Sequence, residues 1–563
     1  MAVATKRGGE VIDCDEEDVG LLFSKGRKRC QEKSEENSGH RFIFDNRDDN
    51  ASKKQATMIE SAIFSPTLVP MKPLISLLFT ILTGASLAAA PNIVLIIADD
   101  MAWNDSGVYG NPYVSTPNID RLAGEGMLFH NAFLTASSCS PSRCSIITGR
   151  YPHNTHAEEL HWPLPANQVT FVEKLKAAGY WTAAAGKWHL GDAARDRFDV
   201  IRETDTSGFQ LPAGAEGQKG KFIETMEGEA QSGCTEWVPL LQDRPQDKPF
   251  FLWLAALDPH RPYHENIIPN GTDPAKVRLA PYHLDTPEVR KDYALYYDEI
   301  RRLDKYVGLV MTELAAQKVE KETMVVFMSD NGRPFPRDKT SIYDSGIKTP
   351  FIVRWPAKVA SGVETKSLVS ALDLAPTFLK MAHLEVGKSF QGKSFLPILM
   401  DPKVKIRDVV IAEQNWHDYE AHSRAVRNED FKYIRNSYPD LPLTPSADGV
   451  RSPTFQAMIK LHAEGNLSGV QSVYFVNPRP KEELYHASID IHETKNLIDD
   501  PAHQKVLNKL RTSLDAWIKE TGDYVPELRT ADEFDRSTGL PTPARVRPRL
   551  SKEEMVKKGL AAP

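Results

Sequence analysis

The chain has 563 residues, of which 41% are hydrophobic and 26% are charged, and its formal net charge is -7. A single core stops growing at roughly 250–300 residues, so this length predicts two domains. The mildly acidic balance argues against nucleic acid as a partner, because no basic excess is present to hold a polyanion. An anionic substrate would have to be bound by a few locally placed cations.

The N-terminal 90 residues differ from the rest. Residues 1–70 are rich in charged and turn-forming residues without sustained periodicity, which predicts disorder, and we interpret them as an extension ahead of the true start. From Met71, a basic start, an apolar run over 74–82 and small residues at 88–90 form a signal-peptide pattern too short for a stable membrane span. We therefore expect a secreted or periplasmic protein; the alternative is a genuine N-terminal region with a buried apolar segment.

Three apolar runs predict strands of one mostly parallel sheet that are buried on both faces, over 92–98, 250–257 and 324–328. Ligands of such sheets gather at the carboxyl ends of the strands. Each run ends in polar residues, which are Asp99 and Asp100, Asp258 and His260, and Asp330 and Asn331. The alternative is that these residues only terminate strands, which would explain one case better than three.

Helical patterns lie between these strands. Prolines suited to a first helical turn follow Thr116 and Thr286, and a third helix is predicted over 170–178. The helix after Thr286 carries one apolar stripe that steps by three and four residues, so we expect this face to be buried. Strands alternating with helices predict an α/β sandwich over 91–400.

The C-terminal part has a different pattern. Short strands and a closing amphipathic helix predict a smaller antiparallel sheet with a helix packed on it, over 401–525. The strands are expected at 409–413, 423–426, 431–435 and 482–485, and the helix at 504–521. The tail, 526–563, is rich in proline and charge, and we expect it to be loosely ordered.

Five cysteines occur, of which Cys14 and Cys30 fall in the N-terminal extension. One bond between Cys144 and Cys234 is arithmetically allowed, but no spacing supports it. We expect no structural set of disulfides.

The remaining cysteine, Cys139, lies in the run Ser138-Cys139-Ser140-Pro141-Ser142-Arg143, which is followed by Thr148-Gly149-Arg150. Ser140 before Pro141 predicts a helix over 141–149 whose N-terminus lies beside Cys139. The unpartnered amide hydrogens of a helix start favour an anion, and Arg143 would add a cation from the first turn. An unmodified cysteine in this setting would be a nucleophilic thiol of low pKa.

This segment resembles the modification signature of type I sulfatases, in which proline and arginine follow the cysteine at two and four residues. The resemblance implies an alkaline phosphatase-like sandwich with a large mixed, mostly parallel sheet and a smaller C-terminal sheet. It also implies that a formylglycine-generating or sulfatase-maturating enzyme oxidises Cys139 to formylglycine. One hydroxyl of the hydrated aldehyde would attack sulfur, and the second would then expel sulfate.

The resemblance further implies a divalent metal site. Asp99, Asp100, Asp330 and Asn331, together with the modified Cys139, would bind Ca²⁺, with Mg²⁺ as the alternative. Oxygen ligands of this kind suit these hard cations and not zinc. Alone, Asp99 and Asp100 would be a weak signal.

Four more residues match positions of the family's site: Lys187, His189, His260 and Lys339. By resemblance, Lys187, His260 and Lys339 would bind the sulfate oxygens, with His260 and Lys339 near the leaving group. His189 would hold the nucleophile. Lys187 and His189 are alternate residues that would face the same side if the segment were extended.

Within the family, the chain looks most like the heparan N-sulfatases, over roughly residues 91 to 522. The matching segments are 330–336, 452–456, 483–485 and 492–497. It departs from them at Lys339, where they have arginine, at Trp188, and in the loop 158–161, which leaves the sugar open. The substrate is therefore expected to be a sulfated saccharide with N-sulfated glucosamine foremost.

Three alternatives stay open. One is an O-sulfate ester hydrolase, and another is a phosphodiesterase or phosphonate hydrolase of the same superfamily. The third is a catalytically silent polysaccharide-binding protein, which would have no need of a modifiable cysteine. The sequence leaves the oligomeric state open, and a homodimer is compatible with it.

Overall fold

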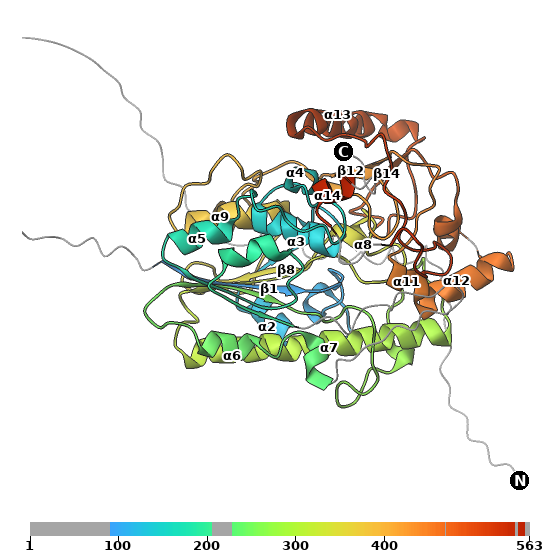
Figure 1. Ribbon diagram of the computed structural model, residues 1–563. Coiled ribbons are helices and arrows are strands. Elements are labelled where there is room, and N and C mark those ends of the chain that lie inside the picture. The colour runs from blue at the N-terminus through green and yellow to red at the C-terminus, as the bar shows by residue number, and fades with distance from the viewer. Residues whose placement is uncertain (1–89, 205–227, 468, 546–549, 558–563) are drawn as a thin grey trace, which may run out of the picture. The chain divides into compact units, whose positions relative to one another are not determined.

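The computed structural model describes residues 90–204, 228–467, 469–545 and 550–557 (Figure 1). All of the described residues belong to one compact unit. The predicted extension and all but the last residue of the predicted signal peptide lie outside the described residues. The predicted domain boundary at residue 400 stays a prediction, since both sides of it fall in one unit.

A sheet of eight strands forms the centre of this unit. Five neighbouring strands run parallel, whereas β8 (Phe351–Arg354) is antiparallel to both β7 (Thr323–Ser329) and β2 (Met127–Phe129). The predicted mixed, mostly parallel sheet is therefore confirmed. In spatial order the strands are β5 (Val200–Glu203), β4 (Trp181–Gly186), β6 (Phe250–Ala255), β1 (Asn92–Ala98), β7 (Thr323–Ser329), β8 (Phe351–Arg354), β2 (Met127–Phe129) and β9 (Val363–Thr365).

The three predicted apolar runs are the neighbouring strands β6, β1 and β7. Six of the seven residues of β1 are buried, as expected of a strand that helices cover on both faces. The register pairs Ile97 with Ala255 and Ala98 with Ser329, so the three strands end at the same edge of the sheet. This register brings the polar residues that follow the strands together.

Helices cover the sheet in two layers (Figure 1). The longest described helix, α7 (Pro287–Ala316), begins where Thr286 accepts a hydrogen bond from the amide of Val289, and its predicted apolar stripe is buried. One layer contains α2 (Pro117–Gly124), α6 (Trp237–Gln242) and α7 (Pro287–Ala316), and the other contains α3 (Cys139–Thr148), α5 (Phe171–Ala177) and α9 (Leu374–Met381).

A second, antiparallel sheet of four strands follows in the sequence, as predicted. The apolar face of α13 (Gln504–Thr521) packs on it, with Leu507, Leu510 and Leu514 buried. The strands of this second sheet are β11 (Val410–Gln414), β12 (Ser423–Arg427), β13 (Lys432–Asn436) and β14 (Glu482–Tyr485).

Short elements connect these layers. β3 and β10 form a two-stranded parallel sheet. The bounds are β3 (Ala132–Phe133), β10 (Val369–Ser370), α4 (Pro152–Thr155), α8 (Asp344–Ile347), α10 (Leu396–Met400), α11 (Ala447–Arg451), α12 (Pro453–Ala463) and α14 (Lys552–Lys557).

The loosely ordered tail stays a prediction, although some of its described residues contact other parts of the chain. Phe534 is buried, and Lys552 of α14 forms an ion pair with Glu158 at 2.7 Å between Nζ and Oε1. Such contacts could not be predicted from the proline-rich composition of the tail, because the partner residues lie far away in the sequence.

All three cysteines of the described chain, Cys139, Cys144 and Cys234, are free and buried. Cys144 and Cys234 do not form a disulfide with each other. Within the described residues, no helix combines the length and apolar character needed to cross a bilayer.

His153 links the main sheet's helices to the second sheet. Its Nδ1 lies 2.7 Å from Oε1 of Glu413 on β11 and 3.9 Å from Oδ1 of Asp523. Burial alone would lower the pKa of His153, but these carboxylates outweigh it and raise the pKa above the ordinary 6.5. The protonated histidine therefore stabilises the folded state below about pH 6.5, and this contribution is lost as pH rises through the raised pKa.

We expect His153→Gln to destabilise the protein more at about pH 6 than at about pH 9 in urea unfolding. His422 provides a comparison of opposite sign, because burial lowers its pKa to about 3 and keeps it neutral in the folded state. The cost of His422→Gln should therefore be smaller at about pH 6 than at about pH 9, since the unfolded histidine takes up a proton near pH 6 that the folded one does not. A pH-independent cost of His153→Gln would show that the charge of His153 contributes nothing.

Candidate active site

Cys139 is the first residue of α3, so the helix begins two residues earlier than predicted. Ser138, not Ser140, precedes the helix, and the carbonyl of Ser138 accepts the first helical hydrogen bond from the amide of Ser142, at 2.9 Å. Pro141 still falls in the first turn, where a missing amide hydrogen costs nothing. The helix ends at Gly149, whose φ of 60° favours glycine.

Four side chains meet where this helix start faces the strand ends. Ligand atoms of Asp99, Asp100, Cys139 and Asp330 all lie within 4.8 Å of one another. Cys139 Sγ is 3.6 Å from Oδ1 of Asp99 and 3.8 Å from Oδ1 of Asp100. The three aspartates are fully buried. The structure thus brings together the residues predicted as metal ligands.

Asn331 completes this group, and glycine is required after it. The amide nitrogen of Asn331 donates to Asp100, while its Oδ1 is buried without a hydrogen-bond partner among the described residues. A Cβ on Gly332 would lie 2.0 Å from the carbonyl oxygen of Ser345, so only glycine allows this approach.

Three cations surround the carboxylates. Lys187 contacts Asp99, and Lys339 Nζ lies 2.7 Å from Oδ2 of Asp100. Arg143 extends from the second turn of α3, not from the first as predicted, and its Nε lies 2.8 Å from Oδ2 of Asp330. Three buried acids thus face three buried bases.

The Cys139 thiol does not have the low pKa expected of a nucleophilic cysteine. Burial raises its pKa well above the ordinary value, although Lys187 and Lys339 act in the opposite direction. The helix start and the neighbouring cations thus fail to offset the loss of water and the nearby carboxylates. A buried protonated thiol is a poor nucleophile, which argues against direct chemistry by the unmodified side chain.

The pKa values of Asp99 and Asp330 are shifted in opposite directions. Burial would raise the pKa of Asp99, but Lys187 and His260 outweigh it and hold the pKa below its usual range. For Asp330, burial prevails over Arg143, and the pKa is raised.

These residues fit a hard divalent cation. Three carboxylates converge, and the orphaned Oδ1 of Asn331 supplies a neutral oxygen that lacks a donor. Oxygen-only sets of this kind suit Ca²⁺ or Mg²⁺.

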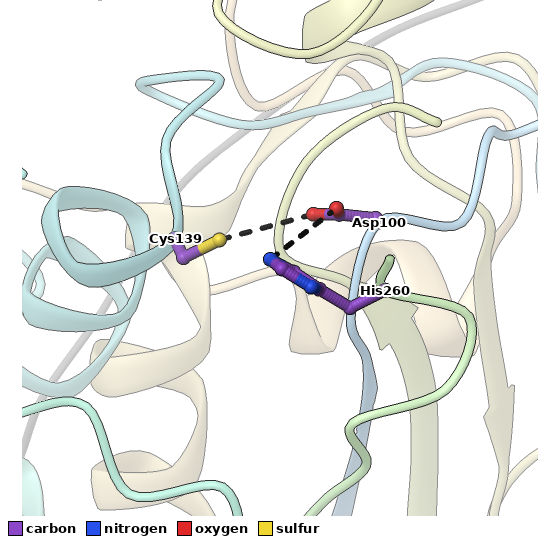
Figure 2. A group of neighbouring side chains, drawn as sticks. All are labelled: Asp100, Cys139 and His260. Atoms are coloured by element: carbon purple, nitrogen blue, oxygen red, sulfur yellow. Dashed lines mark hydrogen bonds and ion pairs between the residues drawn. The ribbon is translucent and has the colours of Figure 1, made fainter. Parts of the chain in front are cut away.

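His260 points toward both Asp100 and Cys139 (Figure 2), and ligand atoms of these three residues lie within 4.8 Å of one another. Its Nε2 is 3.8 Å from Oδ2 of Asp100 and 4.0 Å from Oδ2 of Asp448. His260 therefore lies close to Cys139, and its role beside the leaving group stays a prediction.

His189 does not share a face with Lys187 as an extended segment would require. β4 ends at Gly186, and the φ of His189 is 55°, so the backbone turns between the two residues. Nε2 of His189 lies 2.7 Å from Nδ1 of His161, whose amide donates to Oγ of Ser140 at 2.7 Å. His189 therefore reaches the Cys139 helix through His161.

Sequence reasoning missed two residues of the C-terminal part that border the site. Nδ1 of His417 lies 2.7 Å from Oγ of Ser138, next to Cys139, and Asp448 contacts His260. Neither belongs to a local motif, and only Asp448 lies near segment 452–456, which resembles the heparan N-sulfatases.

Two family models match the chain. The model described as sulfatase matches residues 91–384, and the model described as N-sulphoglucosamine sulphohydrolase, C-terminal, matches residues 335–440. The first covers the main sheet and every predicted catalytic and metal-binding residue.

Characterised relatives point the same way. The chain is 31% identical over 487 residues to N-sulphoglucosamine sulphohydrolase of Homo sapiens, an alignment that covers 78% of this chain and 92% of the relative. It is also 31% identical over 487 residues to an ulvan-active sulfatase of Formosa agariphila, covering 78% of this chain and 77% of the relative.

Solved structures share the fold. BT4656 in complex with D-glucosamine-2-N,6-O-disulfate superposes with a TM-score of 0.56 at 20% identity, over 77% of this chain and 98% of the other. BT1596, a 2-O GAG sulfatase, gives a TM-score of 0.56 at 22% identity, over 77% of this chain and 93% of the other. With the family models and the relatives, these findings show that the chain belongs to the sulfatase family and is a sulfuric ester hydrolase or sulfamidase.

Proposed function

We propose that this sulfatase removes sulfate from sulfated saccharides, and that its preferred substrate is N-sulfated glucosamine. The match of the C-terminal model over residues 335–440 and the 92% coverage of the human N-sulphoglucosamine sulphohydrolase support this substrate. The observation that carries the proposal is the contact of Cys139 with Asp99 and Asp100 inside a ring of three cations.

We propose that the nucleophile is formylglycine made from Cys139 by a maturation enzyme. The hydrated aldehyde supplies an oxygen nucleophile that the buried thiol lacks. A divalent ion, Ca²⁺ or Mg²⁺, held by Asp99, Asp100, Asp330 and Asn331 would supply Lewis acidity that acidifies this nucleophile and offsets sulfate charge.

The remaining residues bind the substrate and move a proton. Lys187, Lys339 and Arg143 carry the positive charge that the three sulfate oxygens need. His260 is the partly exposed acid beside the site, so in its protonated form it donates to the leaving atom. His189, through its contact with His161, orients the helix that carries residue 139.

The cellular setting belongs to the same proposal. The signal-peptide pattern that begins at Met71 supports a secreted or periplasmic enzyme that meets its polysaccharide outside the cytoplasm. A maturation enzyme must act on Cys139 before it is buried, and a homodimer is compatible with the proposal.

A second candidate is hydrolysis of an O-sulfate ester on another polysaccharide. The 31% identity to an ulvan-active sulfatase favours it, since this relative aligns over the same 487 residues. The relatives described above are sulfatases. They give no comparable support to a phosphodiesterase activity or to a catalytically silent polysaccharide-binding protein.

The test is sulfate release by the mature, metal-loaded protein from glucosamine N-sulfate, glucosamine 6-sulfate and an aryl sulfate. We expect the highest kcat/KM for glucosamine N-sulfate. A preference for the 6-sulfate would favour the second candidate. No release from any of the three by protein with formylglycine at position 139 would contradict the proposal.

A further inference from the structure

His260 and Asp448 are more exposed than the charged residues that lie deeper in the site. Their side chains are 26% and 20% exposed, whereas those of Lys339 and Asp100 are 3% and 0% exposed. A sulfate group that reaches Cys139 therefore leaves its saccharide beside this pair. The atom that departs from sulfur would face the same two side chains.

One oxygen of Asp448 accepts a hydrogen bond, and the other faces His260 without accepting one. Oδ1 accepts a hydrogen bond from the amide of Gly449 at 2.9 Å, as suits a carboxylate in the first turn of α11. Oδ2 is buried, has no hydrogen-bond partner among the described residues, and lies 4.0 Å from Nε2 of His260. A buried acceptor without a donor is costly, so this oxygen is suited to a ligand's N–H or O–H.

The charge of Asp448 is maintained by its surroundings. Burial would raise its pKa, but Lys339 and His260 outweigh this effect and hold the pKa far below its usual range. The carboxylate is therefore favoured in its ionised form and can attract a cation.

We infer that Asp448 selects for an amine leaving group, by accepting a hydrogen bond from the N–H of an N-sulfated amino sugar and stabilising the ammonium that forms there. The inference rests on the proposed function and names the group that would distinguish a sulfamate from a sulfate ester. It assigns a specificity role to a residue of the C-terminal part that no sequence motif marks.

The chemistry of the two leaving groups explains the selection. Cleavage of a sulfamate breaks the S–N bond, its electron pair stays on nitrogen, and the sulfuryl group passes to the oxygen nucleophile at position 139. With water as the final acceptor, R–NH–SO3⁻ and H2O give R–NH3⁺ and SO4²⁻. An ester instead gives a neutral alcohol, sulfate and a released proton. A fixed carboxylate at the leaving atom therefore stabilises the cationic product more than the neutral one.

The test compares Asp448→Asn with the wild-type protein, each mature and metal-loaded, on glucosamine N-sulfate and an aryl sulfate. We expect the ratio of the two kcat/KM values to fall by ~10-fold or more, since a single preorganised electrostatic contact contributes on this scale. Asp440→Asn is a matched control, because Asp440 pairs with Arg529 on the exposed surface, and it should leave the ratio unchanged. Circular dichroism and metal-induced thermal shifts check that each variant is folded.

The outcomes separate the inference from the function on which it rests. An unchanged ratio in Asp448→Asn, with or without an equal loss on both substrates, would overturn the inference alone, because Asp448 would then only support His260. A wild-type protein that cleaves the aryl sulfate and not glucosamine N-sulfate would overturn both the inference and the proposed substrate.

Discussion

A Cys139→Ala variant is expected to lose sulfate release by ~1000-fold or more, because it removes the atom from which the nucleophile is made. The fold should persist, since Cys139 is a single small side chain at a helix start and alanine is a good helix former. Sulfate release with an aryl sulfate, together with a thermal melt, measures both effects.

Cys144 provides the control for this variant. It is a free, fully buried cysteine on the same helix, five residues further on, and burial raises its pKa to about 12. Cys144→Ala should therefore cost some stability and leave sulfate release in place. Turnover retained by Cys139→Ala would remove the proposed nucleophile altogether.

Asp330→Asn is expected to lower activity by ~100-fold or more, because it removes a charged ligand from the proposed metal site. It also takes away the partner of Arg143, whose Nε lies 2.8 Å from Oδ2 of Asp330. Chelation of the wild-type protein should have a similar effect, and added Ca²⁺ should restore activity.

A thermal shift reports binding without catalysis. Added at about 100 times its dissociation constant, a metal that binds only the folded state stabilises it by ~2.7 kcal/mol. We expect Ca²⁺ to raise the Tm of the chelated wild-type protein and to have little effect on Asp330→Asn.

Asp258 supplies the comparison, because it also follows a central strand and is buried, but it pairs with Arg302 outside the carboxylate group. Asp258→Asn should lower stability and keep the Ca²⁺-dependent shift. An Asp330→Asn variant with an undiminished shift would contradict the metal assignment.

The sequence predicted the elements whose pattern is local. The apolar runs that became β6, β1 and β7 are buried on both faces, so every residue carries the signal, and the stripe of α7 repeats over many turns. Parallel pairing then places Asp99 and Asp330 at one sheet edge. The predicted carboxylate group follows from these two facts.

Other features depend on partners that are distant in the sequence. α3 begins at Cys139, and the hydroxyl of Ser140 accepts a hydrogen bond from the amide of His161, which is distant in the sequence. The left-handed turn at His189 and the contact of Asp448 with His260 carry no local pattern. The pKa of Cys139 depends on how completely the surrounding chain excludes water, which no motif records.

The most direct test is the peptide mass of residue 139 in preparations made with and without a maturation enzyme, measured beside the specific activity of each. The account predicts that sulfate release rises in proportion to the fraction of chains in which the CH2SH side chain has become an aldehyde. Fully active protein that carries only the unmodified thiol at this position would contradict it.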